Sequence, residues 1–220
     1  MIISAVLSGS TFPETMSVIA PRHLSMPNTM SAIDTSRNSV SSRATSQSKL
    51  SRQLQHPHVT LIEYKTARFL ITDQPSANNM ENFIHTCHLH NVNLLVRVCE
   101  PTYDEKLLEA AGISVVDMEF EDGAPPTESV IQKWFQLLND LWHTQPDACV
   151  AVHCRAGLGR APALVAVALI ELGLPFDVSI EMIRSRRAGA LNTRQIQYLR
   201  DVRPHKRLRL KNHSDRCLIL

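Results

Sequence analysis

The sequence predicts an α/β fold in which a central, mainly parallel sheet is flanked by helices. Segments with strand composition alternate with segments of helical spacing from residue 58 to residue 202, and this alternation is typical of a parallel sheet with both faces covered. Some of the strand segments are apolar throughout, as strands buried on both faces are. A chain of 220 residues with 44% hydrophobic content can also bury one full core.

The predicted strands are short runs of β-branched and apolar residues. The run Ala148–Val152 is fully apolar, and Leu94–Cys99 is apolar apart from one arginine, so both indicate buried strands. In chain order, the predicted strands are His58–Tyr64, Arg68–Thr72, Leu94–Cys99, Ser114–Phe120 and Ala148–Val152.

The predicted helices carry apolar residues three or four positions apart. Thr127–His143 has the best-defined start, because Thr127 can cap the helix and Pro126 precedes it. Gly112 marks the end of a shorter helix. The full set is Ala77–His90, Tyr103–Ala110, Thr127–His143, Ala161–Leu172, Phe176–Arg186 and Arg194–Val202.

Composition divides the chain into three parts. Residues 1–56 are rich in serine and threonine without helical or strand periodicity, and we expect them to form a disordered N-terminal extension. Their basic bias faintly resembles a mitochondrial transit peptide, a less favoured interpretation. Residues 57–203 form the predicted domain, and residues 204–220 form a basic tail.

Charge and hydropathy exclude several function classes. A formal net charge of +2 is too small to indicate a nucleic-acid partner. No apolar run approaches the roughly 18 residues of a membrane span. The odd number of cysteines, without framework spacing, favours cysteine reactivity over a disulfide scaffold. These cysteines are Cys87, Cys99, Cys149, Cys154 and Cys217.

The chemistry is predicted for residues 153–160, between an apolar strand and a buried helix. Glycines at 157 and 159 allow the backbone to curl so that its N–H groups face inward, which forms a cradle for a phosphate dianion at a helix N-terminus. The same field would lower the pKa of Cys154 and make it a nucleophile. Arg160 can hold two phosphoryl oxygens with its planar guanidinium. The predicted phosphate-binding loop is Arg155, Ala156, Gly157, Leu158, Gly159 and Arg160.

The structural alternative is a strand-to-helix turn with a small buried cysteine. Against it, the stretch 153–162 (HCRAGLGRAP) resembles the active-site loop of the cysteine-dependent protein tyrosine phosphatases, whose signature is Cys, five residues, then Arg. It is most similar to the phosphatase of regenerating liver family, the prenylated type IVA tyrosine phosphatases. Further resemblance lies in residues 68–72, 96–100 and 121–126 and in the terminal CaaX box. The resemblance implies a dual-specificity-phosphatase-like fold and a phosphatase domain over residues 57–203.

The resemblance also implies a general acid and a redox partner. Asp122, in a turn-prone segment, aligns with the family's general acid, and the adjacent Glu121 is the competing assignment. Cys99 aligns with the cysteine that forms a reversible disulfide with the nucleophile, here Cys154. The reaction needs no metal or other cofactor. A cluster of histidines at residues 85–90 is discounted as a metal site, because no carboxylate or second cysteine lies near it in the sequence.

Two residues of the loop bear on substrate and rate. Family members usually carry an apolar residue where this chain has Arg155. A second cation would favour multiply charged substrates such as phosphoinositides, so the expected substrate is a phosphoprotein or a phosphoinositide. Ala161 agrees with the family but lacks the hydroxyl that most of the superfamily places after the arginine. Slow release of the phosphocysteine is therefore expected.

The tail predicts a lipid anchor. Residues 217–220 (CLIL) fit a prenylation signal at Cys217, and the terminal leucine favours a geranylgeranyl group. A basic cluster precedes it, so a prenyltransferase and an anionic membrane surface are expected partners, at the cytoplasmic face of the plasma membrane or endosomes. The cluster comprises Arg203, Lys206, Arg207, Arg209 and Lys211, with Arg184, Arg186 and Arg187 as its predicted extension on the domain.

Two functions stay open on the sequence. The first is a slow phosphatase that acts through a phosphocysteine. The second is a binding module, because proteins of the resembling family dock CBS-domain magnesium transporters through the catalytic face. Monomer and homo-oligomer are both left open.

Overall fold

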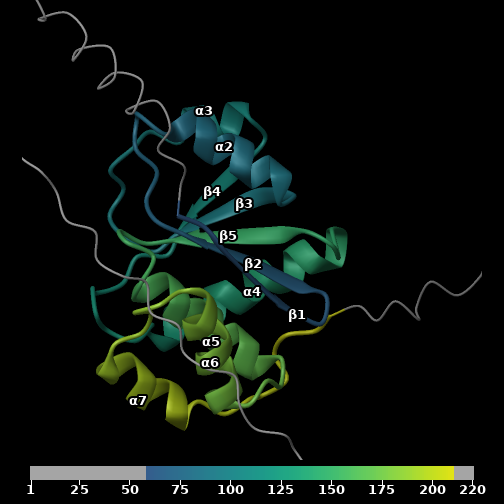
Figure 1. Ribbon diagram of the computed structural model, residues 1–220. Helices are drawn as coiled ribbons and strands as arrows, with labels where there is room; N and C mark the ends of the chain where they lie inside the picture. The colour runs from purple at the N-terminus through teal and green to yellow at the C-terminus, as the bar shows by residue number, and fades with distance from the viewer. Residues whose placement is uncertain (1–57, 211–220) are drawn as a thin grey trace, which may run out of the picture. The chain divides into compact units, whose positions relative to one another are not determined.

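The computed structural model describes residues 58–210; the predicted extension 1–56 and the CaaX box with Cys217 lie outside the described residues. Within the described part, the strands form one sheet in the order β1-β2-β5-β3-β4 (Figure 1). Only β1 is antiparallel to its neighbour, and the other adjacent strands are parallel. The bounds are β1 (Thr60–Tyr64), β2 (Ala67–Thr72), β3 (Val92–Arg97), β4 (Ser114–Asp117) and β5 (Cys149–His153).

Helices cover both faces of the sheet. Figure 1 shows α2 and α3 on one face and α4 to α7 on the other. This arrangement confirms the predicted α/β fold with a mainly parallel sheet. The bounds are α2 (Met80–Leu89), α3 (Lys106–Ala110), α4 (Glu128–Thr144), α5 (Arg160–Glu171), α6 (Phe176–Arg186) and α7 (Thr193–Asp201).

The central strand β5 divides the core because its side chains alternate between the two faces. Cys149 and Ala151 pack in the cluster below α2 and α3. Val150 and Val152 pack in the larger cluster formed with α4 to α7. Every residue of α5 is buried, and between the charged residues at its two ends, Arg160 and Glu171, the helix is apolar on all sides.

Two strands end earlier than the sequence predicts. We expected strands over Leu94–Cys99 and Ser114–Phe120, but the ladder between β3 and β4 ends at the pair Arg97 and Asp117. Beyond that pair, the segments that follow β3 and β4 leave the sheet as loops. Cys99 and Phe120 are still buried, so their apolar character reflects core packing and not strand pairing.

Residues 204–210 run along α4 and α5. Glu171, at the end of α5, is fully buried, and its carboxylate accepts bonds from the backbone N–H groups of His205 and Arg207. Asn139 of α4 donates to the Arg207 carbonyl at 2.8 Å and accepts from the Arg209 N–H at 3.1 Å. None of the helices in the described part is long and apolar enough to cross a bilayer.

Candidate active site

The predicted site residues gather at the edge of the sheet where the parallel strands end. The loop after β5 carries Cys154 and leads to Arg160, the first residue of α5. The loop after β3 carries Cys99, and the loop after β4 carries Asp122. In open α/β sheets this edge is where ligands bind, so the topology brings together residues that the sequence separates.

The loop after β5 is held by bonds to its carbonyl groups. The Gln74 N–H donates to the Arg155 carbonyl at 3.1 Å, and the Leu191 N–H donates to the Leu158 carbonyl at 2.7 Å. Arg187 donates to the carbonyls of Ala156 and Gly157 at 3.0 and 2.5 Å. In a trans peptide unit the N–H points opposite to the C=O. Carbonyls bound from outside therefore turn the intervening N–H groups toward the inside of the loop.

Gly157 is the position at which this loop requires glycine. Its φ is +65°, and a Cβ placed there would collide with the Arg187 guanidinium and the Thr72 carbonyl. The strand-to-helix turn can therefore close around an anion only without a side chain at this residue.

The structure corrects the predicted role of Arg187. We expected it to extend a basic surface with Arg184 and Arg186, but Arg187 is fully buried. Besides the loop carbonyls, its guanidinium donates to the His58 carbonyl and to Thr60 Oγ1. Burial without a carboxylate partner is tolerated because these acceptors occupy its N–H groups.

Arg160 is buried at the mouth of the loop. Its Nη1 donates to the Phe120 carbonyl at 3.3 Å and lies 3.8 Å from Glu100 Oε2. Its Nε lies 3.1 Å from Asp122 Oδ1 but makes no hydrogen bond within the described residues. The guanidinium thus keeps a donor that a phosphoryl oxygen can use.

The two adjacent carboxylates point to different partners. Asp122 lies against Arg160, and its side chain is 76% exposed. Glu121 lies 3.7 Å from Arg194 of α7, measured between Oε1 and Nη1. Asp122 is therefore the carboxylate of this pair that borders the Cys154 loop.

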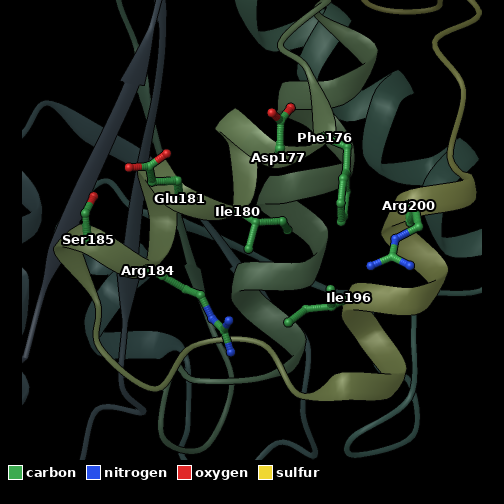
Figure 2. Close-up of a pocket in the computed structure, with 8 residues that line it drawn as sticks. All are labelled: Phe176, Asp177, Ile180, Glu181, Arg184, Ser185, Ile196 and Arg200. Carbon is green, nitrogen blue, oxygen red and sulfur yellow. The ribbon is translucent and has the colours of Figure 1, made fainter.

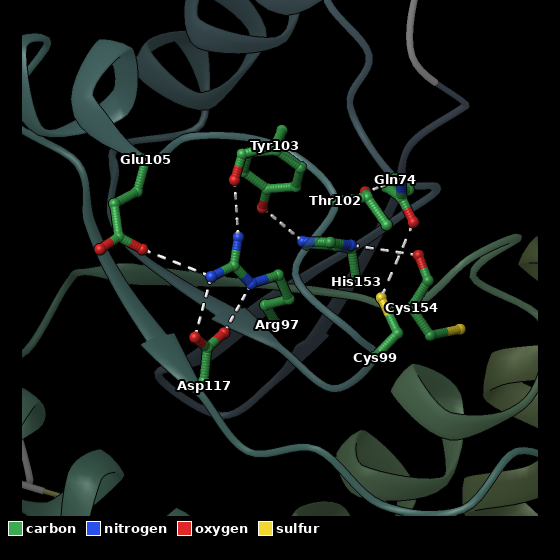
Figure 3. Close-up of polar contacts among 9 residues, drawn as sticks. All are labelled: Gln74, Arg97, Cys99, Thr102, Tyr103, Glu105, Asp117, His153 and Cys154. Atoms are coloured by element: carbon green, nitrogen blue, oxygen red, sulfur yellow. Dashed lines mark hydrogen bonds and ion pairs between the residues drawn. The ribbon is translucent and has the colours of Figure 1, made fainter.

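Cys99 and Cys154 are both free thiols and both buried. The Cys99 Sγ lies 3.9 Å from Gln74 Oε1, and Figure 3 shows the two cysteines in the same region. Burial raises the pKa of Cys99 to about 11; Arg160 acts against this shift, and Cys154 acts in the same direction as burial. At neutral pH, Cys99 is therefore a protonated thiol.

A chain of polar contacts approaches Cys154 from β3 (Figure 3), and its members Arg97 and His153 are buried. Arg97 pairs with Asp117 at 2.5 Å and with Glu105 at 3.3 Å, and it donates to the Tyr103 carbonyl. The Tyr103 hydroxyl lies 2.7 Å from His153 Nε2, and His153 Nδ1 lies 3.1 Å from the Cys154 carbonyl.

These contacts define the state of His153. Burial lowers its pKa to about 4, so the ring is neutral at pH 7. In that state Nδ1–H donates to the Cys154 carbonyl and Nε2 accepts from Tyr103, since a carbonyl can only accept. The backbone of Cys154 is thereby tied to Arg97 through the side chains of His153 and Tyr103.

Comparison with known proteins identifies the family. A family model described as "Polymorphic toxin system, DSP-PTPase phosphatase" matches residues 72–174. The chain is 50% identical over 164 residues to the PRL-1 phosphatase of Drosophila melanogaster, covering 74% of this chain and 93% of the fly protein. It is 44% identical over 171 residues to human protein tyrosine phosphatase type IVA 3, covering 76% and 99% of the two chains. The chain belongs to the protein tyrosine phosphatase type IVA family.

Solved structures agree with this assignment. A Leishmania major protein described as a protein tyrosine phosphatase superposes with a TM-score of 0.59 at 38% identity, covering 66% of this chain and 99% of that one. Kinase associated phosphatase superposes with a TM-score of 0.57 at 17% identity, covering 66% and 93%, and this likeness concerns the fold alone. The predicted resemblance is confirmed, and this type IVA chain is a protein tyrosine phosphatase.

Some residues around the site of this type IVA phosphatase were missed by the sequence reasoning. Arg97 carried a signal, because a single cation inside an apolar strand must find a partner. Tyr103 gave none, since it fits an ordinary helical segment. Within residues 58–210, no group of three or more His, Cys, Asp or Glu side chains is placed to hold a metal ion.

The described residues also line cavities away from the loop after β5. A cavity of about 550 Å³ lies between α6 and α7 and is lined by Phe176, Ile180 and Ile196, with charged side chains around them (Figure 2). None of the predicted site residues lines it. A second, of about 640 Å³, is lined by Gln74 and Tyr103, which also contact the active-site region.

Proposed function

We propose that this tyrosine phosphatase works through a phosphocysteine on Cys154. The observation that carries the proposal is the loop after β5, whose carbonyls are bound from outside while Arg160 and Asp122 border its mouth. Cys154 Sγ attacks phosphorus and the ester oxygen leaves with the proton of Asp122. Water activated by the Asp122 carboxylate then displaces Cys154 and releases phosphate. Arg160 and the loop N–H groups stabilise the charge on the transferred oxygens.

Slow release of phosphate is part of the proposal. Ala161 follows Arg160 and is fully buried, so the departing Cys154 thiolate receives no hydroxyl from this position. Single-turnover and steady-state kinetics on the reduced protein should show a burst followed by slow turnover, and mass spectrometry should detect the phosphate on Cys154. Cys154→Ser should show no burst. Absence of phosphocysteine under any reducing condition would contradict the mechanism.

Arg155 supports a proposal that the substrates include phosphoinositides. Its side chain is exposed beside Cys154, where it adds a second cation to Arg160. Arg155→Val should therefore lose more activity toward a phosphoinositide than toward a phosphotyrosine peptide. Equal loss on both substrates would remove the support.

A disulfide between Cys99 and Cys154 is proposed as an oxidative brake. Support comes from the buried neighbourhood of the two thiols and their electrostatic interaction. Mild peroxide treatment followed by thiol trapping and mass spectrometry should find the linkage in wild type and not in Cys99→Ser. A wild-type protein that reaches only sulfenic acid would contradict the proposal.

Membrane anchoring and docking complete the proposal. Prenylation at Cys217, next to the basic tail, would hold the phosphatase at a cytoplasmic membrane face. Mass spectrometry of the protein isolated from cells should find the added mass of the prenyl group in the wild type and not in Cys217→Ser.

Slow turnover, expected from Ala161, favours a second function, docking of CBS-domain magnesium transporters through the catalytic face. A pull-down with wild type and Cys154→Ser would test it, and an absence of any CBS-domain partner would contradict it.

A further inference from the structure

The loop that carries Asp122 is bound by the first turn of α7. The Gly123 carbonyl accepts a hydrogen bond from Asn192 Nδ2 at 2.9 Å. The next carbonyl, that of Ala124, accepts from Gln195 Nε2 at 3.1 Å. These two bonds hold the backbone directly after the carboxylate, while Asp122 itself is exposed and contacts Arg160.

The same two side chains also cap α7, through their other amide atoms. Asn192 Oδ1 accepts from the Gln195 N–H at 2.8 Å, and Gln195 Oε1 accepts from the Asn192 N–H at 3.1 Å. This is a reciprocal capping box. In each residue the amide oxygen therefore serves the helix, and the amide nitrogen serves the loop.

Capping alone does not require amides at these positions. Serine or aspartate caps a helix as well as asparagine, and glutamate completes the box as well as glutamine. The two N–H₂ groups are thus surplus to the cap, and both are directed at consecutive carbonyls of one loop. Gln195 and Ala124 are buried, so their bond is also shielded from water.

We propose that Asn192 and Gln195 are positioning residues that hold the Asp122 loop over the Cys154 cradle through their amide nitrogens. The inference rests on the proposed role of Asp122 as general acid. Release of the Gly123 and Ala124 carbonyls would let the carboxylate move away from the leaving oxygen. The attack of Cys154 on phosphorus would remain possible, because the cradle is held by Arg187, Gln74 and Leu191 instead.

The test uses substrates that differ in their need for a proton. Phenyl phosphate has a poor leaving group and needs the general acid, whereas p-nitrophenyl phosphate has a good one and depends on it little. The burst rate is measured for each substrate, because it reports the step in which Asp122 donates. Asp122→Asn serves as the reference, with an expected loss of about 100-fold or more on phenyl phosphate.

Two variants remove the donors and keep the cap. Asn192→Ser retains an acceptor for the Gln195 N–H, and Gln195→Glu retains one for the Asn192 N–H. We expect each to slow the phenyl phosphate burst about tenfold or more and the p-nitrophenyl phosphate burst about twofold or less. Thr193→Ala, which alters the same helical turn but neither amide, should leave both rates unchanged. If Gln195→Glu does not fold, the exposed Asn192→Ser carries the test.

The outcomes separate the two proposals. The positioning role alone is overturned if Asp122→Asn slows phenyl phosphate more than p-nitrophenyl phosphate, while neither Asn192→Ser nor Gln195→Glu shows this difference between the substrates. Equal slowing of both substrates by these variants overturns it as well, since that pattern is general damage to the fold. A wild-type protein that forms no phosphocysteine under any reducing condition overturns the phosphocysteine mechanism and the positioning role together.

Discussion

At the scale of single residues, the loop after β5 owes its shape to residues that the Cys-to-Arg signature does not contain. The Arg187 side chain and the Gln74 backbone N–H hold its carbonyls, and His153 holds the carbonyl of Cys154. The signature predicts the chemistry. The shape that makes the chemistry possible depends on residues up to 80 positions away, because Gln74 and Cys154 lie that far apart in the chain.

The first prediction concerns Gly157. Gly157→Ala would place a methyl group against Arg187 and the Thr72 carbonyl, in addition to the strain of a positive φ. We expect it to abolish the burst and to lower the free energy of unfolding by more than about 2 kcal/mol. Gly112→Ala is the matched control, because Gly112 also has a positive φ but no atom within 4 Å of its Cβ position. Urea denaturation should show a loss of only about 1 kcal/mol there.

The second prediction concerns the pH dependence of stability. His153 has a pKa of about 4 in the fold, whereas a histidine in the unfolded chain titrates near about 6.5. The unfolded state therefore binds more protons between these values, and stability falls as the pH falls through that window. This group should lower the free energy of unfolding by about 2 kcal/mol between pH 7 and pH 5.

Urea denaturation at several pH values measures this dependence. His153→Gln removes the titrating ring, so its free energy of unfolding should change less over the same range than that of the wild type. Parallel curves for the two proteins would show that His153 is not the responsible group.

At the scale of secondary-structure elements, the sequence predicts each strand and helix of the described part to within a few residues. Alternation, caps and apolar faces are local signals, and α6 matches its predicted range at both ends. The ends of β3 and β4 are set by where the two strands stop pairing, which is a tertiary property. The burial of Arg187 was missed for the same reason, since its acceptors come from the loop after β5 and from residues 58–60.

The third prediction tests a local signal, the cap of α4. Thr127 Oγ1 accepts from the Val130 N–H at 3.4 Å, as the sequence predicts for a cap. Thr127→Ala should lower the free energy of unfolding by about 1 kcal/mol, and Thr127→Ser should leave it nearly unchanged. Thermal or urea unfolding measures both. A serine variant as unstable as the alanine variant would show that the methyl group, and not the cap, is what matters.

At the scale of the whole molecule, the described domain continues into the predicted tail. Buried Glu171 binds the backbone of His205 and Arg207, and Arg207 also pairs with exposed Glu128 of α4 at 2.7 Å. The start of the basic tail is therefore fixed on the surface of α4 and α5. Any membrane contact made by later residues would act on the domain through this attachment.

The fourth prediction tests that attachment. In Glu171→Gln, an amide N–H₂ would face backbone N–H groups, so we expect a loss of about 1–3 kcal/mol in the free energy of unfolding. Amide exchange at Arg207 should become faster. Glu128→Gln is the matched control, because it removes the exposed partner of the same arginine and should cost less than about 1 kcal/mol. Equal effects of the two variants would contradict a special role for the buried carboxylate.

The strand order also has a consequence for synthesis on the ribosome. Strand β5 lies between β2 and β3 but is made after both. Until residue 153 has emerged, β2 and β3 have no common neighbour, and their inner edges stay open for other chains. At about 5–20 residues per second, the 56 residues from 97 to 153 take several seconds to translate. The nascent chain therefore needs protection from aggregation during this interval, which ends just before Cys154 emerges.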